Sequence, residues 1–192
     1  MDLDGAPRVG IVGGGQLARM SAAPAAALGV GLRVLATSPQ ESAAQVIHDV
    51  VLGRHDDLQA LKQLASGCDV VTFDHEHVPP AYLEQLEAMG VAVRPAPSAL
   101  FHAQDKIHMR QALTGIDVPC PRWRVVSALD HVEEFAAETG WPIVLKTSRG
   151  GYDGRGVWVV ESAAQAADVL AVPLAAGAQW LAEERIDFVQ EL

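Results

Sequence analysis

The chain has 192 residues, of which 24 are acidic and 14 are basic, and its formal net charge is −10. Hydrophobic residues make up 49% of it and charged residues 20%, as in folded globular proteins. The acidic balance argues against nucleic-acid binding, because neutralising a phosphate backbone requires clustered Lys and Arg. Cys68 and Cys120 are too few for a disulfide framework or a zinc site. No signal peptide or membrane span is indicated, so we expect a cytoplasmic protein that does not bind membranes.

Strands and helices alternate through the first half of the sequence. The β-branched run 8–12 predicts a strand, and the Ala- and Leu-rich segment 16–28 predicts a helix that Pro24 kinks or splits. The elements expected next are strands at 32–36, 49–52, 69–73 and 91–94 and helices at 58–65 and 82–89. This alternation is typical of a parallel sheet with helices on its faces. Residues 1–95 are therefore expected to form an α/β, Rossmann-like domain.

The composition changes at Pro95-Ala96-Pro97, which marks the start of a second domain at 96–192. The expected elements are helices at 98–103, 106–113, 131–139 and 163–170 and strands at 124–126, 143–147, 157–160, 179–183 and from 186 onward. The strands 143–147 and 157–160 flank a glycine-rich loop and predict a hairpin, so this half is α+β. The sequence stops inside its last expected strand, and we expect the domain to be incomplete.

The first glycine-rich turn, Gly13-Gly14-Gly15, lies between a strand and a helix and fits G-x-G-x-x-A with Ala18. Such turns allow close approach of a ligand, and the amides at a helix N-terminus attract phosphate. A dinucleotide site also needs an acid at the end of the second strand, whereas residues 35–38 read Leu-Ala-Thr-Ser and the first acid is Glu41. A dinucleotide oxidoreductase is therefore disfavoured, and the turn either binds a phosphate or polar substrate or binds nothing.

The second glycine-rich segment, Gly150-Gly-Tyr-Asp-Gly-Arg-Gly156, has four glycines in seven residues. Its backbone N–H groups can surround a polyphosphate, and a plain hairpin turn needs only one or two glycines. It matches neither a P-loop nor a protein-kinase loop. Lys146, in the strand before it, could reach a nucleotide phosphate or a ring nitrogen. The pattern favours a nucleotide-binding loop.

Six motifs span nearly the whole chain: Gly13-Gly-Gly-Gln-Leu-Ala-Arg-Met20, Thr72-Phe-Asp-His-Glu-His-Val-Pro79, Gln104-Asp-Lys106, Val144-Leu-Lys146, Gly150 to Gly156, and Glu183-Glu-Arg-Ile-Asp-Phe-Val-Gln-Glu191. In this order they resemble the 5-(carboxyamino)imidazole ribonucleotide synthases, ATP-dependent ligases of purine biosynthesis in the ATP-grasp superfamily. The resemblance implies a pre-ATP-grasp substrate domain followed by the first part of an ATP-grasp domain.

The implied reaction uses ATP to convert bicarbonate to carboxyphosphate, whose carboxyl group is captured by the amine of aminoimidazole ribonucleotide. The residues implied to contact ATP are Lys106, Lys146, Gly151, Tyr152, Asp153, Gly154, Arg155, Gly156, Val157, Glu183, Glu184, Arg185, Ile186 and Glu191. The candidate catalytic residues, closing around bicarbonate and the ribonucleotide, are Tyr152, Asp153 and Arg155. The candidate substrate residues are Gly15, Gln16, Leu17 and Glu76. Many relatives have Arg where this chain has Lys106. The lysine keeps the positive charge but lacks the guanidinium that can donate two parallel hydrogen bonds to one phosphate.

The resemblance also implies Mg²⁺, with ligands expected beyond residue 192, so no metal ligand is assigned and the chain alone is expected to be inactive. The resemblance is also consistent with a homodimer. Two alternatives remain: a formate- or amino-acid-dependent ATP-grasp ligase acting on another ribonucleotide, and a non-catalytic nucleotide-binding module. Glu76 is either a substrate ligand or a solvated loop carboxylate. His75 and His77 beside it are too few to hold zinc.

Overall fold

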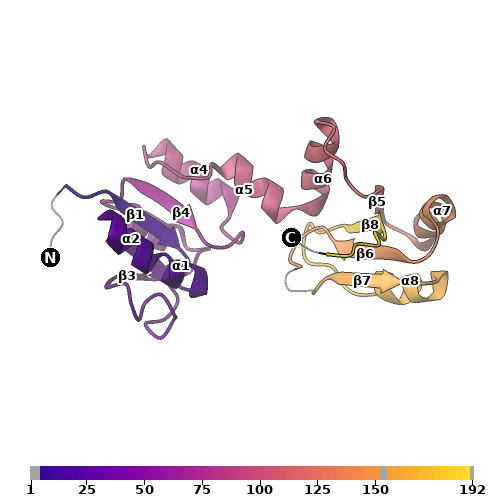
Figure 1. The fold of residues 1–192 in the computed structure, drawn as a ribbon, viewed down its shortest axis with the longest axis horizontal. Helices are drawn as coiled ribbons and strands as arrows, with labels where there is room; N and C mark the ends of the chain where they lie inside the picture. The colour runs from indigo at the N-terminus through magenta and orange to yellow at the C-terminus, as the bar shows by residue number, and fades with distance from the viewer. Residues whose placement is uncertain (1–4, 152–154, 191–192) are drawn as a thin grey trace. The chain divides into compact units, whose positions relative to one another are not determined.

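The computed structural model describes residues 5–151 and 155–190. It divides into two compact units, Met1–Phe101 and His102–Leu192 (Figure 1). No helix among the described residues is long and apolar enough to cross a membrane.

The first unit is built on a four-stranded parallel sheet in the order β3-β2-β1-β4. The strands are β1 (Arg8–Val12), β2 (Gly31–Ala36), β3 (Asp49–Leu52) and β4 (Val70–Phe73). The helices are α1 (Gln16–Met20), α2 (Ala22–Leu28), α3 (Leu58–Ala65) and α4 (Pro80–Ala88), and α5 (Pro97–Gln104) spans the boundary with the second unit. The alternation in the sequence thus correctly predicts a parallel α/β sheet.

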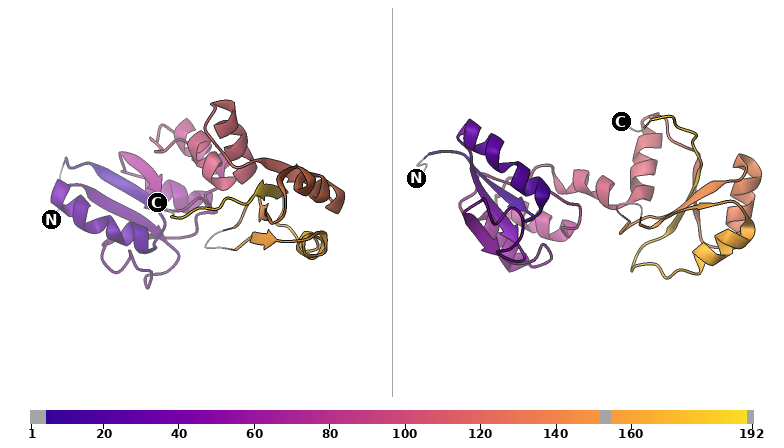
Figure 2. Two further views of the ribbon diagram at one scale, coloured as in Figure 1. Left: turned by 45° about the vertical axis from the view of Figure 1, so that its right-hand side comes forward. Right: turned by 60° about the horizontal axis from the view of Figure 1, so that its bottom comes forward.

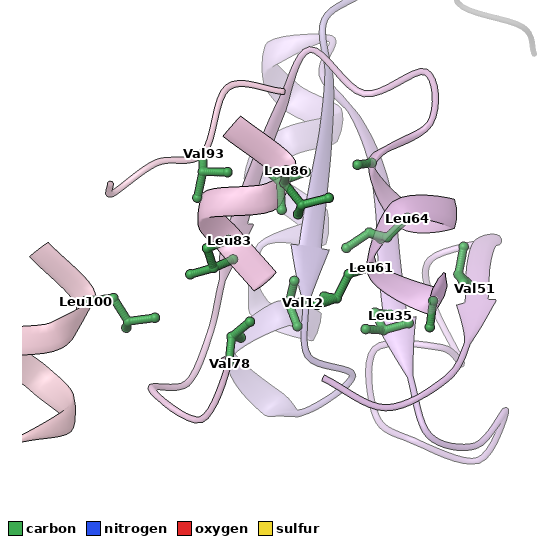
Figure 3. Close-up of a cluster of buried hydrophobic side chains, with 13 residues drawn as sticks. Val12, Leu35, Val51, Leu61, Leu64, Val78, Leu83, Leu86, Val93 and Leu100 are labelled. Atoms are coloured by element: carbon green, nitrogen blue, oxygen red, sulfur yellow. The ribbon is translucent and has the colours of Figure 1, made fainter. Parts of the chain in front are cut away.

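Successive residues of the central strands enter two different cores, because side chains alternate between the faces of a strand. Val12 and Leu35 pack with residues of α3 and α4, such as Leu61 and Leu83 (Figure 3). Their neighbours Ile11 and Val34 pack on the other face with Ala18 and Ile47. Both faces are covered, which explains why these strands read as continuous apolar runs rather than alternating ones.

Two elements of the first unit differ from expectation. The helix expected at 16–28 is two helices that meet at Ser21. In a continuous helix the ring of Pro24 would clash with the carbonyl of Met20, and the break falls directly after Met20. The strand expected at 91–94 is reduced to one bridge between Val93 and Val71. Pro95 follows it and has no N–H to extend the pairing.

The second unit has a four-stranded antiparallel sheet in the order β5-β8-β6-β7. Its elements are α6 (Lys106–Gly115), β5 (Trp123–Val126), α7 (Leu129–Thr139), β6 (Ile143–Thr147), β7 (Val157–Val160), α8 (Ala163–Leu170) and β8 (Trp180–Glu184). Helices α7 and α8 cover one face of the sheet, where Phe135, Leu145 and Trp180 form the core (Figure 2). The predicted hairpin β6–β7 is confirmed.

The strand expected from residue 186 is absent from the described residues, and β8 ends at Glu184. The pairing register of β8 with its two neighbouring strands explains why β8 ends at Glu184. Extending the β6–β8 pairing by one residue would place Arg185 opposite Pro142, and extending the β5–β8 pairing would place it opposite Pro121. Proline has no N–H to donate to a ladder, so neither neighbour can continue the sheet. The chain therefore leaves the sheet at Arg185.

Candidate functional site

A pocket of about 660 Å³ lies on the face of the second sheet that α7 and α8 leave uncovered. Strands β6 and β7 line it with alternate residues, which pair across the hairpin as Val144 with Val159 and Lys146 with Val157. The residues between them, such as Leu145, point into the core. The hairpin therefore presents three valine side chains and one lysine ammonium to the pocket.

Apolar side chains around this pocket remain exposed to solvent. Val159 is 54% exposed, and Ile186 and Phe188, in the segment after β8, are 47% and 64% exposed. A concave site with apolar walls and a few charged groups is the usual form of a small-molecule site, and exposed apolar walls gain free energy when a ligand covers them. The pocket is thus suited to a flat apolar ring system that carries charge at one end.

Three charged side chains from three elements meet in this pocket. The Glu183 side chain, on β8, is 3% exposed. Its Oε1 lies 2.6 Å from Arg110 Nε on α6, and its Oε2 lies 2.5 Å from Lys146 Nζ on β6. Burial alone raises the pKa of Glu183, but the hydrogen bonds and charges of Arg110 and Lys146 outweigh it and hold that pKa below the ordinary value. The carboxylate is therefore ionised and binds both cations.

The lowered pKa of Glu183 makes part of the folding stability depend on pH. A carboxylate whose pKa is depressed in the folded state stabilises the fold above its ordinary pKa, 4.5, and this contribution is lost as pH falls through the folded-state value. We expect the free energy of unfolding to fall on acidification below about pH 4.5, and Glu183→Gln to show a shallower fall. Urea unfolding between pH 6 and 3 measures this. Glu133→Gln, an exposed change on α7, is the matched control, and equal slopes for wild type and Glu183→Gln would contradict the expectation.

The base of the second glycine-rich segment is fixed to the start of α6. Asp105 caps this helix by accepting from the N–H groups of Ile107 and His108, and its Oδ2 lies 2.7 Å from Arg149 Nε. The backbone N–H of Lys106 donates to the carbonyl of Ser148, and Lys106 Nζ lies 3.4 Å from the Gly151 carbonyl oxygen. These contacts hold Lys106 beside the glycine-rich loop. The sequence predicts that this loop binds phosphates.

Gly156 closes this loop in a conformation that side chains rarely adopt. Its φ is +70°, and a Cβ at this position would lie 2.6 Å from Thr147 Oγ1. Its carbonyl accepts from the Thr147 N–H at 2.9 Å, which joins the end of β6 to the start of β7. Glycine is required here for a close backbone turn.

The structure brings a large part of the predicted nucleotide site together. The predicted residues that line the pocket are Lys146, Val157, Glu183, Glu184, Arg185 and Ile186. Lys106, Gly151, Arg155 and Gly156 lie at the loop base or in the loop, and the Glu184 carboxylate is bound by Arg122 at 2.6 Å. Tyr152, Asp153, Gly154 and Glu191 lie outside the described residues. Sequence reasoning missed Arg110, although it lies four residues after Lys106 and therefore on the same side of α6.

A second pocket, of about 430 Å³, lies at the carboxyl ends of the strands in the first unit. The predicted substrate residues Gly15, Gln16 and Leu17 line it. In open α/β sheets, ligands bind at this end of the strands. The placement agrees with a substrate pocket at the first glycine-rich turn.

Two carboxylates face this turn. Asp74 Oδ2 accepts from the Ala18 N–H at 3.3 Å, and a Cβ on Gly13 would lie 1.7 Å from Asp74 Oδ1. Glu41 lies over Gly14 and accepts from the Thr37 N–H at 3.1 Å. Because like charges repel, these carboxylates disfavour a phosphate directly on the turn and favour ligand groups that donate hydrogen bonds, such as hydroxyls and amines.

Glu76 lies in the turn after β4, where its carboxylate is 4.0 Å from His77 Nε2. The residues of this turn that line the pocket are Asp74 and His75. The His75 ring lies 5.3 Å from that of His77 and 5.0 Å from that of His55, centroid to centroid. Burial, followed by the charge of His75, lowers the pKa of His55. Among the described residues, no group of three His, Cys, Asp or Glu side chains is arranged to hold a metal ion.

A parallel-sheet unit followed by an antiparallel sheet with a lysine, a glycine-rich loop and an open pocket is the arrangement that the resemblance to the ATP-grasp class implies. The sequence model of the ribonucleotide synthetase preATP-grasp domain matches residues 7–104, and that of the ATP-grasp domain matches residues 111–192. The chain belongs to the family of ribonucleotide synthetases with a preATP-grasp domain, which confirms the resemblance seen in its motifs.

Several known proteins similar to this chain are N5-carboxyaminoimidazole ribonucleotide synthases. It is 53% identical over 187 residues to the N5-carboxyaminoimidazole ribonucleotide synthase of Mycobacterium tuberculosis, covering 97% of this chain and 44% of that protein. A synthetase of this name, solved as its ADP complex, superposes with a TM-score of 0.84 at 31% identity, covering 96% of this chain and 48% of the other. The enzyme from Aspergillus clavatus, solved with ADP and 5-aminoimidazole ribonucleotide, gives 0.79 at 28%, covering 94% and 46%. The chain thus spans about half the length of the proteins it matches.

Proposed function

We propose that this chain forms the ribonucleotide site and one wall of the ATP site of an N5-carboxyaminoimidazole ribonucleotide synthase. The reaction has two steps. ATP phosphorylates bicarbonate to carboxyphosphate and leaves as ADP, and the exocyclic amine of aminoimidazole ribonucleotide then takes the carboxyl group with loss of phosphate. The pocket on the second sheet carries this proposal, because it combines exposed apolar walls with Lys146 beside a glycine-rich loop.

The pocket supports nucleotide binding in three ways. Val144, Val157 and Val159 provide an apolar surface for a purine ring. The ladder hydrogen bonds of β8 stop at Glu184, so the backbone of Arg185 and Ile186 leaves the sheet where it can read the edge of a base. The Lys146 ammonium supplies positive charge for the phosphates, which phosphoryl transfer requires.

We propose that Tyr152, Asp153 and Arg155 close over bicarbonate and the ribonucleotide. Excluding water here has a direct use, since carboxyphosphate is labile to hydrolysis. In the first unit, Asp74 and Glu41 are suited to accept hydrogen bonds from ribose hydroxyls or the amine of the substrate, with Gly15, Gln16 and Leu17 beside them.

The donor set of the described residues does not fit magnesium. Mg²⁺ is usually held by one or two carboxylates together with substrate phosphates. Glu183, the buried carboxylate of the pocket, is bound to Arg110 and Lys146 instead. We therefore assign no chemical step to a metal held by these residues, and we propose that magnesium ligands come from elsewhere in the enzyme.

The protein carrying this chain is expected to release phosphate from ATP only when both bicarbonate and aminoimidazole ribonucleotide are present. A coupled assay of ADP release, with formate or an amino acid replacing bicarbonate, measures this. Activity that follows formate or an amino acid would indicate a different ATP-grasp ligase. No turnover with any of them, together with tight ADP binding, would indicate a nucleotide-binding module.

A further inference from the structure

We propose that Arg110 is a positioning residue of the nucleotide site: it keeps the buried Glu183 carboxylate neutralised while Lys146 turns from Glu183 toward the nucleotide phosphates. This inference rests on the proposed function, since it concerns the same pocket. It assigns a role to a residue that neither the motifs nor the resemblance singles out.

The geometry gives each oxygen of Glu183 its own cation. Arg110 Nε lies 2.6 Å from Oε1 and Lys146 Nζ lies 2.5 Å from Oε2. The Glu183 side chain is 3% exposed, and those of Arg110 and Lys146 are 16% and 22% exposed. The carboxylate is thus shielded from water and depends on these two partners, since a buried charge without a partner is strongly unfavourable.

Lys146 is proposed to bind two anions in turn, the Glu183 carboxylate and the nucleotide phosphates. Without nucleotide its ammonium binds Glu183, and with nucleotide the phosphates compete for it. A lysine is suited to this exchange, because its ammonium is a compact charge on a flexible chain. An arginine is suited to the fixed position, because its guanidinium stays charged at every relevant pH.

The groups that face Glu183 are few. Arg110 comes from α6 and Lys146 from β6, while the residue opposite on β5, Trp123, is uncharged. Burial raises the pKa of Glu183, and Arg110 is the first of the groups that lower it. Without Arg110, a nucleotide that draws Lys146 away would leave this carboxylate buried and unpaired, and it would take up a proton instead.

The test is a calorimetric titration of the protein carrying this chain with ADP near pH 7, in two buffers with different ionisation enthalpies. We expect wild type to bind ADP without net proton uptake. Arg110→Met is expected to bind roughly tenfold more weakly, to take up as much as about one proton on binding, and to gain affinity as pH falls. Arg110→Lys is expected to restore binding without proton uptake. The matched control is Arg124→Met, because Arg124 pairs with Glu138 away from this pocket.

The double variant Arg110→Met/Glu183→Gln is expected to lose the proton uptake, since Glu183 is the group that takes the proton. Weaker binding by Arg110→Met without any proton uptake would show a merely structural role and overturn the inference. Unchanged ADP affinity in folded Arg110→Met would overturn it as well. Failure of wild type to bind ADP would instead overturn the proposed function, and the inference with it.

Discussion

Replacing Lys146 by alanine is expected to weaken ADP binding by roughly 10- to 100-fold, because a hydrogen bond to a charged group contributes about 1.5–3 kcal/mol. The fold is expected to survive. Glu183 keeps its 2.6 Å contact with Arg110, so the buried carboxylate is not left without a cation. Calorimetry with ADP measures the affinity, and circular dichroism checks the fold.

The control for this experiment is Lys62→Ala, which removes the same side chain from α3 in the first unit. It is expected to leave ADP affinity unchanged. A folded Lys146→Ala variant that binds ADP as tightly as wild type would show that Lys146 does not contact the nucleotide. The pocket would then need another source of positive charge.

Replacing Gly13 by alanine is expected to destabilise the first unit by about 2–4 kcal/mol. The φ of Gly13 is +132°, and holding a residue with a side chain in such a region costs about 1–3 kcal/mol. The new Cβ would also meet the Asp74 carboxylate, which would have to move and give up its hydrogen bond from the Ala18 N–H, a loss of about 1 kcal/mol. Thermal unfolding is expected to shift down by roughly 10 °C or more.

Gly29→Ala is the matched control for Gly13→Ala. Gly29 also has a positive φ, +68°, but a Cβ there meets nothing within 4 Å. Gly29→Ala is expected to lower the free energy of unfolding only by the cost of a side chain in the left-handed region, about 1–2 kcal/mol. Equal loss of stability in the two variants would show that the contact with Asp74 carries no cost, and would remove the evidence that this carboxylate is fixed over the turn.

Local patterns in the sequence were sufficient for elements whose ends are set locally. Helix α8 begins after Ser162, whose side chain accepts from the Gln165 N–H, and helix α3 begins after Asp57, which caps it in the same way. Both helices have the predicted bounds. The same holds for β6 and β7, where glycines and β-branched residues mark the hairpin.

Features that depend on partners distant in the sequence could not be predicted in this way. The end of β8 is set by Pro121 and Pro142, which precede the neighbouring strands β5 and β6, and it follows only from the pairing register. The approach of His55 to His75 joins two loops separated by α3 and β4. The contact of Arg110 with Glu183 joins residues 73 positions apart. The motifs predict which residues belong to a nucleotide site, and the structure shows that Arg110, which they do not include, contacts one of them.

The two prolines that end β8 affect which substitutions the segment after this strand can accept. The end of the strand is fixed by its neighbours, so the segment from Arg185 to Phe188 contributes no rungs to the ladder. Under the proposed function, substitutions in this segment are expected to alter which base edge is accepted without disturbing the sheet behind it. The proposed base-reading backbone thus lies outside the paired strands, so the choice of base could change by substitutions that leave the strand pairing intact.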